Sequence, residues 1–227
     1  MKTKSINYNS LESLLPISSH AIVMSQTVII NRKNWGCSSR TIFFNNLDEK
    51  VQNLICKFLR VSERIEISRS DIFKTDDIGS KIIKALMWGY PRGTTNRAVG
   101  NNNGIHVILT RLHDCCNHLK EIKDCDYKSA DDFLEDEHVS FLFDLRGVGV
   151  STLSKLLYFF NVKIEGKQCV IFDSRVYKAL SRFEETCNLS LRQYKIKDYP
   201  IFVRRIGEIS ENLDVSSDVI EYILFNS

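Results

Sequence analysis

The chain has 227 residues, enough for one domain or two closely packed lobes with a sizeable core. Its composition, 43% hydrophobic and 26% charged, excludes the disordered and fibrous classes, and 10 Gly with 3 Pro provide few turns for a many-stranded β protein. The formal net charge of +3 neither requires nor excludes a nucleic-acid partner.

Cysteine usage and hydropathy indicate the kind of cellular compartment in which the protein is expected. The seven cysteines are an odd number, Cys115 and Cys116 are adjacent, and Met1 to Ser10 is polar, so we expect reduced thiols and no secretory leader. No apolar run approaches the ~18 residues of a membrane span, so no membrane partner is expected.

The N-terminal part of the chain is the least readable. Ala21 to Ile30 is apolar and β-branched, which fits either a strand or a buried helix, and both remain open. Beyond it, apolar residues at helical spacing predict a mostly α fold. The expected helices contain Val51 to Leu59 after Asp48 and Glu49, a segment from Asp76 or Asp77 to Gly89, one long helix from Ile105 to Ile122, a helix capped by Ser129, Phe202 to Leu213, and a last helix opened by Ser217.

Two glycines mark a very short turn between two helices at Leu145 to Gly149. Gly147 and Gly149 permit positive φ angles and the close approach of another backbone, while Val148 can plug the turn into the core. The helix that follows would leave its first-turn N–H groups facing outward, where a phosphate can bind. An ordinary corner between two helices is the alternative.

An apolar segment then leads to Asp173 at the start of another helix, within Ile171-Phe172-Asp173-Ser174-Arg175-Val176. By itself Asp173 is most simply a helix N-cap. A Leu-x-Gly-Val-Gly turn followed by such a segment, however, resembles the helix-hairpin-helix DNA glycosylase superfamily, and looks most like small bacterial proteins described as 8-oxoguanine-glycosylase-like. The motif match covers Leu145 to Leu180, with a looser extension at Met87 to Gly93.

The resemblance implies a bilobal domain over 1–227, with the helix-hairpin-helix (139–160) at the cleft between two packed helical lobes. One lobe is expected to be 72–165 and the other 1–71 plus 166–227. The resemblance also implies that Asp173 is catalytic, because a carboxylate can stabilise the positive charge that develops on deoxyribose when the N-glycosidic bond breaks. The residues expected to contact DNA are Gly147, Val148, Gly149, Val150, Ser151 and Arg175.

The nucleophile is where the sequence departs from the family pattern. Bifunctional relatives use a lysine two residues after the second hairpin glycine, a position that Ser151 occupies here. Either water is the nucleophile, or Lys155 substitutes for it from the same helical face, one turn later. A solvated Lys155 on an exposed face is the alternative.

No cofactor is expected. Iron–sulfur relatives carry four closely spaced cysteines after the aspartate, whereas only Cys187 follows Asp173. The spacing of a second group matches no standard zinc pattern, so no metal site is expected and core thiols are preferred. That group is His113, Cys115, Cys116, His118 and Cys125.

Trp88, Tyr90 and Arg92, with Arg97 further on, surround a turn and have the aromatic and cationic character that suits a base pocket. A core anchor is the alternative for Trp88. Asp131 to Glu137 is expected to be a solvated face.

Together these features predict a DNA glycosylase that flips a damaged or modified base out of double-stranded DNA and excises it. The base would be oxidised guanine or a hypermodified base of phage DNA, and both remain open. The alternatives are a non-catalytic helix-hairpin-helix module and a helical interaction protein that binds no DNA. We expect a monomer in the cytoplasm, associated with the nucleoid.

Overall fold

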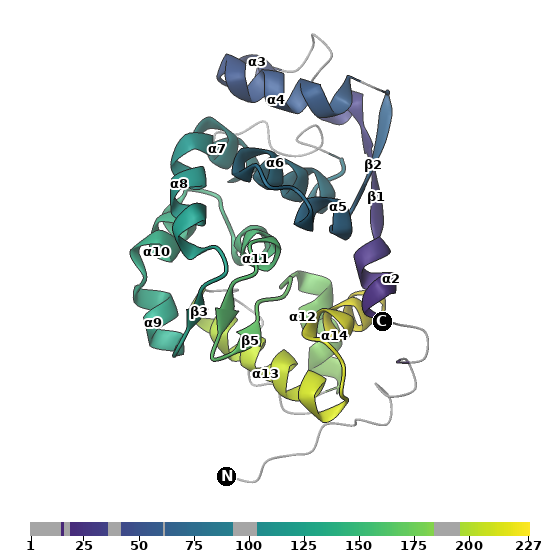
Figure 1. The fold of residues 1–227 in the computed structure, drawn as a ribbon, viewed down its shortest axis with the longest axis vertical. Coiled ribbons are helices and arrows are strands. Elements are labelled where there is room, and N and C mark those ends of the chain that lie inside the picture. The colour runs from purple at the N-terminus through teal and green to yellow at the C-terminus, as the bar shows by residue number, and fades with distance from the viewer. Residues whose placement is uncertain (1–14, 16–18, 36–41, 61, 93–103, 184–195) are drawn as a thin grey trace.

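The computed structural model describes residues 15, 19–35, 42–60, 62–92, 104–183 and 196–227, and this part of the chain is mostly helical, as predicted (Figure 1). Its α-helices are α2 (His20–Ser25), α3 (Ile42–Asn45), α4 (Glu49–Leu59), α5 (Arg69–Phe73), α6 (Ile78–Gly89), α7 (Gly104–Thr110), α8 (Leu112–Ile122), α9 (Ala130–Glu135), α10 (Glu137–Asp144), α11 (Val150–Phe159), α12 (Ser174–Phe183), α13 (Tyr199–Asn212) and α14 (Ser217–Asn226). Two 3-10 helices are η2 (Arg32–Trp35) and η3 (Ile196–Asp198).

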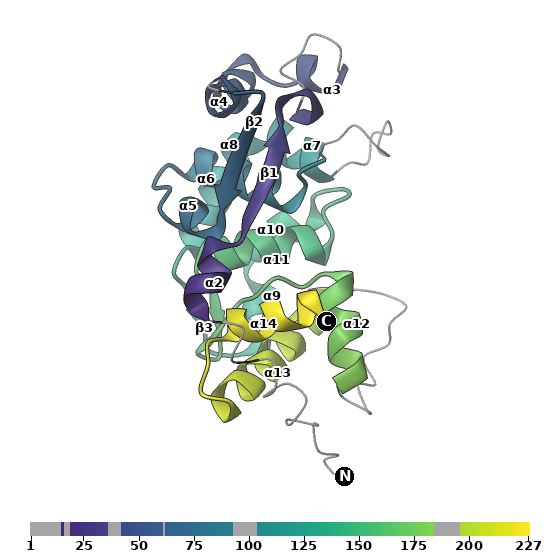
Figure 2. The same cartoon turned by 90° about the vertical axis from the view of Figure 1, so that its right-hand side faces the viewer.

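Two small sheets accompany the helices. β1 (Thr27–Asn31) pairs antiparallel with β2 (Arg64–Ser68), from Thr27 opposite Ser68 to Asn31 opposite Arg64, and both strands pack against α6 (Figure 2). In the second sheet β4 (Lys163–Ile164) lies between β3 (Asp126–Tyr127), parallel to it, and β5 (Lys167–Gln168), antiparallel to it. The segment Ala21 to Ile30, for which strand and helix were both open, is therefore divided between α2 and β1.

Helix starts follow the local signals of the sequence. Asp48, Asp77 and Ser129 accept hydrogen bonds from backbone N–H groups of the first turns of α4, α6 and α9, which confirms these three predicted starts.

The prediction of one helix from Ile105 to Ile122 is wrong, because Arg111 leaves the helical region (φ −110°, ψ 30°) between α7 and α8. Thr110 donates its hydroxyl to the carbonyls of His106 and Val107 at 3.0 Å, a local bond of the kind that bends helices.

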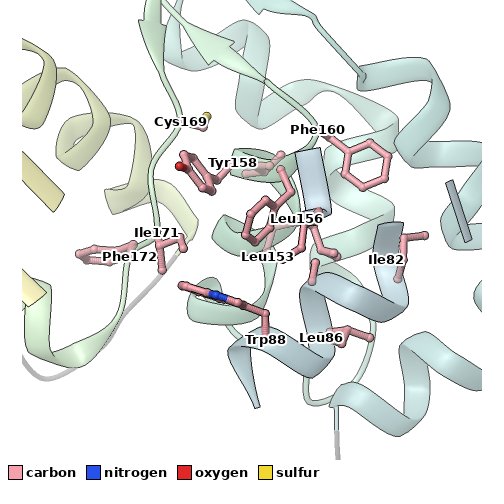
Figure 3. Packing of buried hydrophobic residues seen from close by; sticks show 14 of the residues in the cluster. Ile82, Leu86, Trp88, Leu153, Leu156, Tyr158, Phe160, Cys169, Ile171 and Phe172 are labelled. Atoms are coloured by element: carbon pink, nitrogen blue, oxygen red, sulfur yellow. The ribbon is translucent and has the colours of Figure 1, made fainter. Parts of the chain in front are cut away.

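Helix α11 lies at the centre of the molecule. Every residue of α11 except Ser151 is buried, as expected for a helix surrounded by other elements. In Figure 3 the side chains of Leu153 and Leu156 lie beside α6, while Ile171 and Phe172, on the segment before α12, pack from the other direction. The core of the protein is thus organised around the helix that follows the two-glycine turn.

In Figure 1, α3 to α8 lie at one end of the molecule and α12 to α14 at the other, with α11 between them. The division into lobes 72–165 and 1–71 plus 166–227 stays a prediction.

Candidate functional site

The turn between α10 and α11 is built as its glycines predicted, with one exception. Gly147 has a φ of +83°, a conformation that side chains disfavour, and the N–H of Val148 donates to the carbonyl of Leu145 at 2.9 Å. Val148 is buried, which confirms that it plugs the turn into the core. Gly149 has a φ of −90°, so only Gly147 uses the positive-φ freedom of glycine.

A third glycine, which sequence reasoning missed, supports this turn. A Cβ on Gly104 would lie 2.3 Å from the carbonyl oxygen of Gly147 and 2.9 Å from the nitrogen of Val148. The start of α7 can therefore lie directly against the turn only because residue 104 has no side chain. The signal was a single glycine at the beginning of an amphipathic segment.

The N-terminus of α11 is the part of this turn that can meet a ligand. Gly149 is the N-cap and provides no side-chain oxygen to the first turn, and a Cβ built on it would meet no described atom within 4 Å. Arg146, which sequence reasoning did not single out, is exposed on the same turn. The helix dipole and the first N–H groups at such an end favour an anion.

Lys155 lies beneath this N-terminus and is buried, with 6% of its surface exposed. Its amine donates to the carbonyl of Ser151 at 2.8 Å and to the Ser151 hydroxyl at 2.9 Å, and lies 5.3 Å from the centre of the Tyr90 ring. The alternative of a solvated Lys155 is wrong, because α11 has no exposed face at that position. The shared face with Ser151 is confirmed.

Burial lowers the pKa of Lys155 to about 8. The carboxylates of Asp173 and Glu221 oppose this shift, and the Arg69 guanidinium adds to it. Roughly a quarter of an amine with this pKa is neutral near pH 7.5, against about one part in a thousand for an ordinary lysine, so burial greatly increases the neutral fraction of Lys155.

Asp173 lies at the start of α12 and is half-buried. One carboxylate oxygen, Oδ1, accepts from the N–H groups of Arg175 at 2.8 Å and Val176 at 3.0 Å, so Asp173 is an N-cap. The segment before it is fixed to α11, because the N–H of Phe172 donates to the buried Ser154 hydroxyl at 3.0 Å. The negative charge of Asp173 acts on the Lys155 amine and raises the pKa of that amine.

The three residues expected to line a base pocket have different surroundings. Tyr90 is brought to Lys155, and its hydroxyl lies 2.6 Å from that of Thr152, at the first turn of α11. Trp88 is in the core, edge-to-face with Phe159, and its indole N–H donates to the carbonyl of Gln26 at 3.2 Å. This is the placement of a core anchor, the alternative for Trp88, and its role in a pocket stays a prediction.

Arg92 is exposed at the end of the same turn, whereas Arg97 lies outside the described residues. Arg175 is also exposed, with its guanidinium 5.2 Å from the centre of the Phe225 ring.

A buried ion pair lies behind the site. Arg69 donates to Glu221 at 2.7 Å and to the side chain of Gln26 at 2.8 Å, and its guanidinium lies over the rings of Trp88 and Tyr158. The second carboxylate oxygen of Glu221 is buried and has no hydrogen-bond partner among the residues that the structure describes. No sequence signal identified this pair.

Four of the five histidines and cysteines of this group lie on α8. Cys115 is buried in α8, and burial raises the pKa of its thiol to about 12, while His118 is hydrogen-bonded to His138. Within the described ranges, no three His, Cys, Asp or Glu side chains are placed to hold a metal ion.

None of the helices in this part of the chain is long and apolar enough to span a membrane.

Comparison with known families decides what this chain is related to. The model of a family described as "Putative 8-oxoguanine DNA glycosylase OGG-like protein" matches residues 23–225. The chain belongs to this OGG-like family. The match confirms the resemblance and extends it from Leu145 to Leu180 over most of the chain, including the N-terminal third where no motif was recognised. No curated protein and no solved structure gave a significant match.

Proposed function

We propose that this protein is a DNA glycosylase that removes a damaged or modified base from double-stranded DNA by cleaving its N-glycosidic bond. The observation that carries the proposal is a buried amine near the N-terminus of α11: Lys155 is bonded to Ser151 one turn earlier, and the charge of the Asp173 carboxylate acts on it and raises its pKa. Family membership points to oxidised guanine as the base. This chemistry needs both a nucleophile and an anion to stabilise the sugar cation.

DNA would be held at the turn between α10 and α11, which we propose acts as a helix-hairpin-helix. A phosphate would approach the N–H groups of Val150 and Ser151, where Gly149 leaves the surface open. Exposed Arg146 and Arg175 would add phosphate contacts. Such contacts position the duplex without reading its sequence, so the specificity must come from the pocket for the flipped base.

In the chemical step the neutral Lys155 amine attacks C1′ of the flipped nucleotide. A bond forms between Nζ and C1′ while the C1′–N bond to the base breaks, and its electron pair leaves on the base, which takes up a proton. One proton of the amine nitrogen is passed to the departing base. The C1′–O4′ bond then breaks as the C1′=N bond forms, and O4′ takes the second proton, which gives the open-ring Schiff base. The Asp173 carboxylate stabilises the positive charge on the sugar during bond cleavage.

The test identifies the products that the protein forms from a panel of modified duplexes. Duplexes that each contain one oxidised, alkylated or phage-type hypermodified base are incubated with the protein, and free bases are identified by mass spectrometry. Hot alkali reveals abasic sites, and borohydride during turnover traps a Schiff base as a protein–DNA adduct. We expect free 8-oxoguanine and an adduct that Lys155→Ala abolishes.

Other outcomes separate the alternatives. Base release without an adduct means that water is the nucleophile and removes Lys155 from that role. Salt-dependent binding without release from any duplex means a non-catalytic DNA-binding module.

A further inference from the structure

The side chain of Lys155 is held along its own helix instead of extending from it. Both hydrogen bonds of its amine are to Ser151, one turn earlier: 2.8 Å to the carbonyl oxygen and 2.9 Å to the hydroxyl. Side chains in a helix lean toward its N-terminus, which brings residue 155 over residue 151. The amine is therefore at the side chain that occupies the lysine position of the family pattern.

The end of α6 forms the opposite wall. A Cβ on Gly89 would lie 2.6 Å from Cδ and 2.8 Å from Cε of Lys155, so a side chain at residue 89 would force the Lys155 stem to move from this position. Next to it, the Tyr90 ring lies beneath the amine at 5.3 Å. Tyr90 is itself fixed at both ends, because its hydroxyl is bonded to Thr152 and its carbonyl accepts from the Trp35 indole at 3.2 Å.

The two hydrogen bonds to Ser151 restrict the direction of the lone pair of the Lys155 amine. A neutral amine has two N–H groups and one lone pair. If the carbonyl and the hydroxyl of Ser151 each accept one N–H, the lone pair has one remaining direction. Ser151 is the one residue of α11 that is not buried, so the open side of the site begins there.

We infer that Ser151 is a positioning residue, which accepts both N–H groups of the neutral Lys155 amine and so directs its lone pair toward the sugar, while Gly89 and Tyr90 confine the stem. This inference rests on the proposed function. It assigns to the Ser151 side chain a role in the chemical step, separate from any contact of its backbone with DNA.

The charged and titratable groups around the amine come from four elements: Tyr90 at the end of α6, Arg69 in α5, Asp173 at the start of α12 and Glu221 in α14. None of these residues is replaced in a Ser151 variant, although Ser151→Ala also removes a side-chain hydrogen bond to Tyr90, which keeps its bond to Thr152. Since the hydroxyl also accepts from the charged form, its removal disfavours the ammonium and lowers the pKa of Lys155.

Ser151→Ala should therefore increase the neutral fraction of the Lys155 amine and yet lower the reaction rate. More of the amine is neutral, which alone would speed the reaction, yet we expect borohydride trapping at saturating enzyme to slow about tenfold because the lone pair is no longer directed. Ser151→Thr keeps the hydroxyl and should trap within about threefold of wild type. The dissociation constant for DNA, measured for each variant, separates binding from chemistry.

A second readout needs neither DNA nor activity. With ¹³C-labelled lysine, the Cε resonance of Lys155, assigned by its loss in Lys155→Met, reports the pKa of the amine directly. We expect a titration near pH 8 in wild type and Ser151→Thr, and a lower pKa in Ser151→Ala.

Three results would overturn the inference: trapping by Ser151→Ala at the wild-type rate, no rescue by threonine, or an unchanged Cε titration. Base release by wild type without any adduct would reject the amine as nucleophile, and with it this role of Ser151. A lowered pKa in Ser151→Ala would then still show that the hydroxyl holds the amine, so failure of the proposed chemistry and failure of the Ser151 contact are distinguishable.

Discussion

The guanidinium of Arg69 in α5 and the carboxylate of Glu221 in α14 form an ion pair of 2.7 Å in which both side chains are 1% exposed. The pair joins segments that are far apart in the sequence, and both of its charges act on the pKa of Lys155. Burial raises the pKa of Glu221, and the Arg69 charge opposes that shift.

Breaking this pair from one side should be costly. Arg69→Met leaves a buried carboxylate without its partner, and we expect the free energy of unfolding in urea to fall by about 3–5 kcal/mol. The double variant Arg69→Met, Glu221→Leu removes both charges and should recover most of that loss. Losses that simply add in the double variant would show that the two side chains do not stabilise each other.

The two-glycine turn permits a separation of folding from DNA binding. Gly149→Ala adds a Cβ that meets nothing, at a φ that alanine adopts, so its stability should stay within about 1 kcal/mol of wild type. The same Cβ stands where a phosphate would approach, so affinity for damaged and undamaged duplex should fall together. Melting curves and gel shifts over a range of salt concentrations check both.

Gly104→Ala is the matched contrast. Its Cβ would collide with the backbone of Gly147, so we expect a loss of about 1–3 kcal/mol in stability, with weaker DNA binding as the turn is displaced. If Gly149→Ala binds DNA as wild type does, the N-terminus of α11 is not the phosphate site.

The lowered pKa of Lys155 should also appear in the pH dependence of stability. The unfolded chain binds a proton at this amine up to about pH 10.5, whereas the folded chain releases it near pH 8, so its contribution to stability rises with pH between these values. We expect the stability of wild type relative to Lys155→Met to increase by about 3 kcal/mol across this window. The difference between the two proteins is needed, because the raised thiol pKa values of Cys115 and Cys169 act in the opposite direction and cancel in it. A flat difference would mean that Lys155 titrates as an exposed lysine does.

Local signals in the sequence predicted much of the fold. The starts of α4, α6 and α9, the buried Val148 and the capping role of Asp173 depend on residues a few positions apart, and all are confirmed. The continuous helix predicted through Arg111 failed because hydrophobic periodicity continues across a local break.

The site depends on contacts that no local pattern encodes. Helical spacing could not place Lys155, because every residue of α11 except Ser151 is buried, so the polar residues of this helix do not mark a solvated face. Its slot is formed by Gly89 and Tyr90, more than sixty positions earlier in the chain. The Arg69–Glu221 pair is still more distant in sequence, and only the folded structure brings it behind the site.

The most direct measurement is the single-turnover rate of base release from a duplex containing one 8-oxoguanine, for wild type and Asp173→Asn. Asparagine retains the Oδ1 oxygen that accepts from Arg175 and Val176, so the melting temperature and the affinity for DNA should change little. We predict that wild type frees 8-oxoguanine and that the variant does so at least about a hundredfold more slowly, because the sugar cation loses its carboxylate. Release at equal rates by both proteins would mean that Asp173 is only a helix cap, and no free base from wild type would contradict the proposal that this protein is an 8-oxoguanine glycosylase.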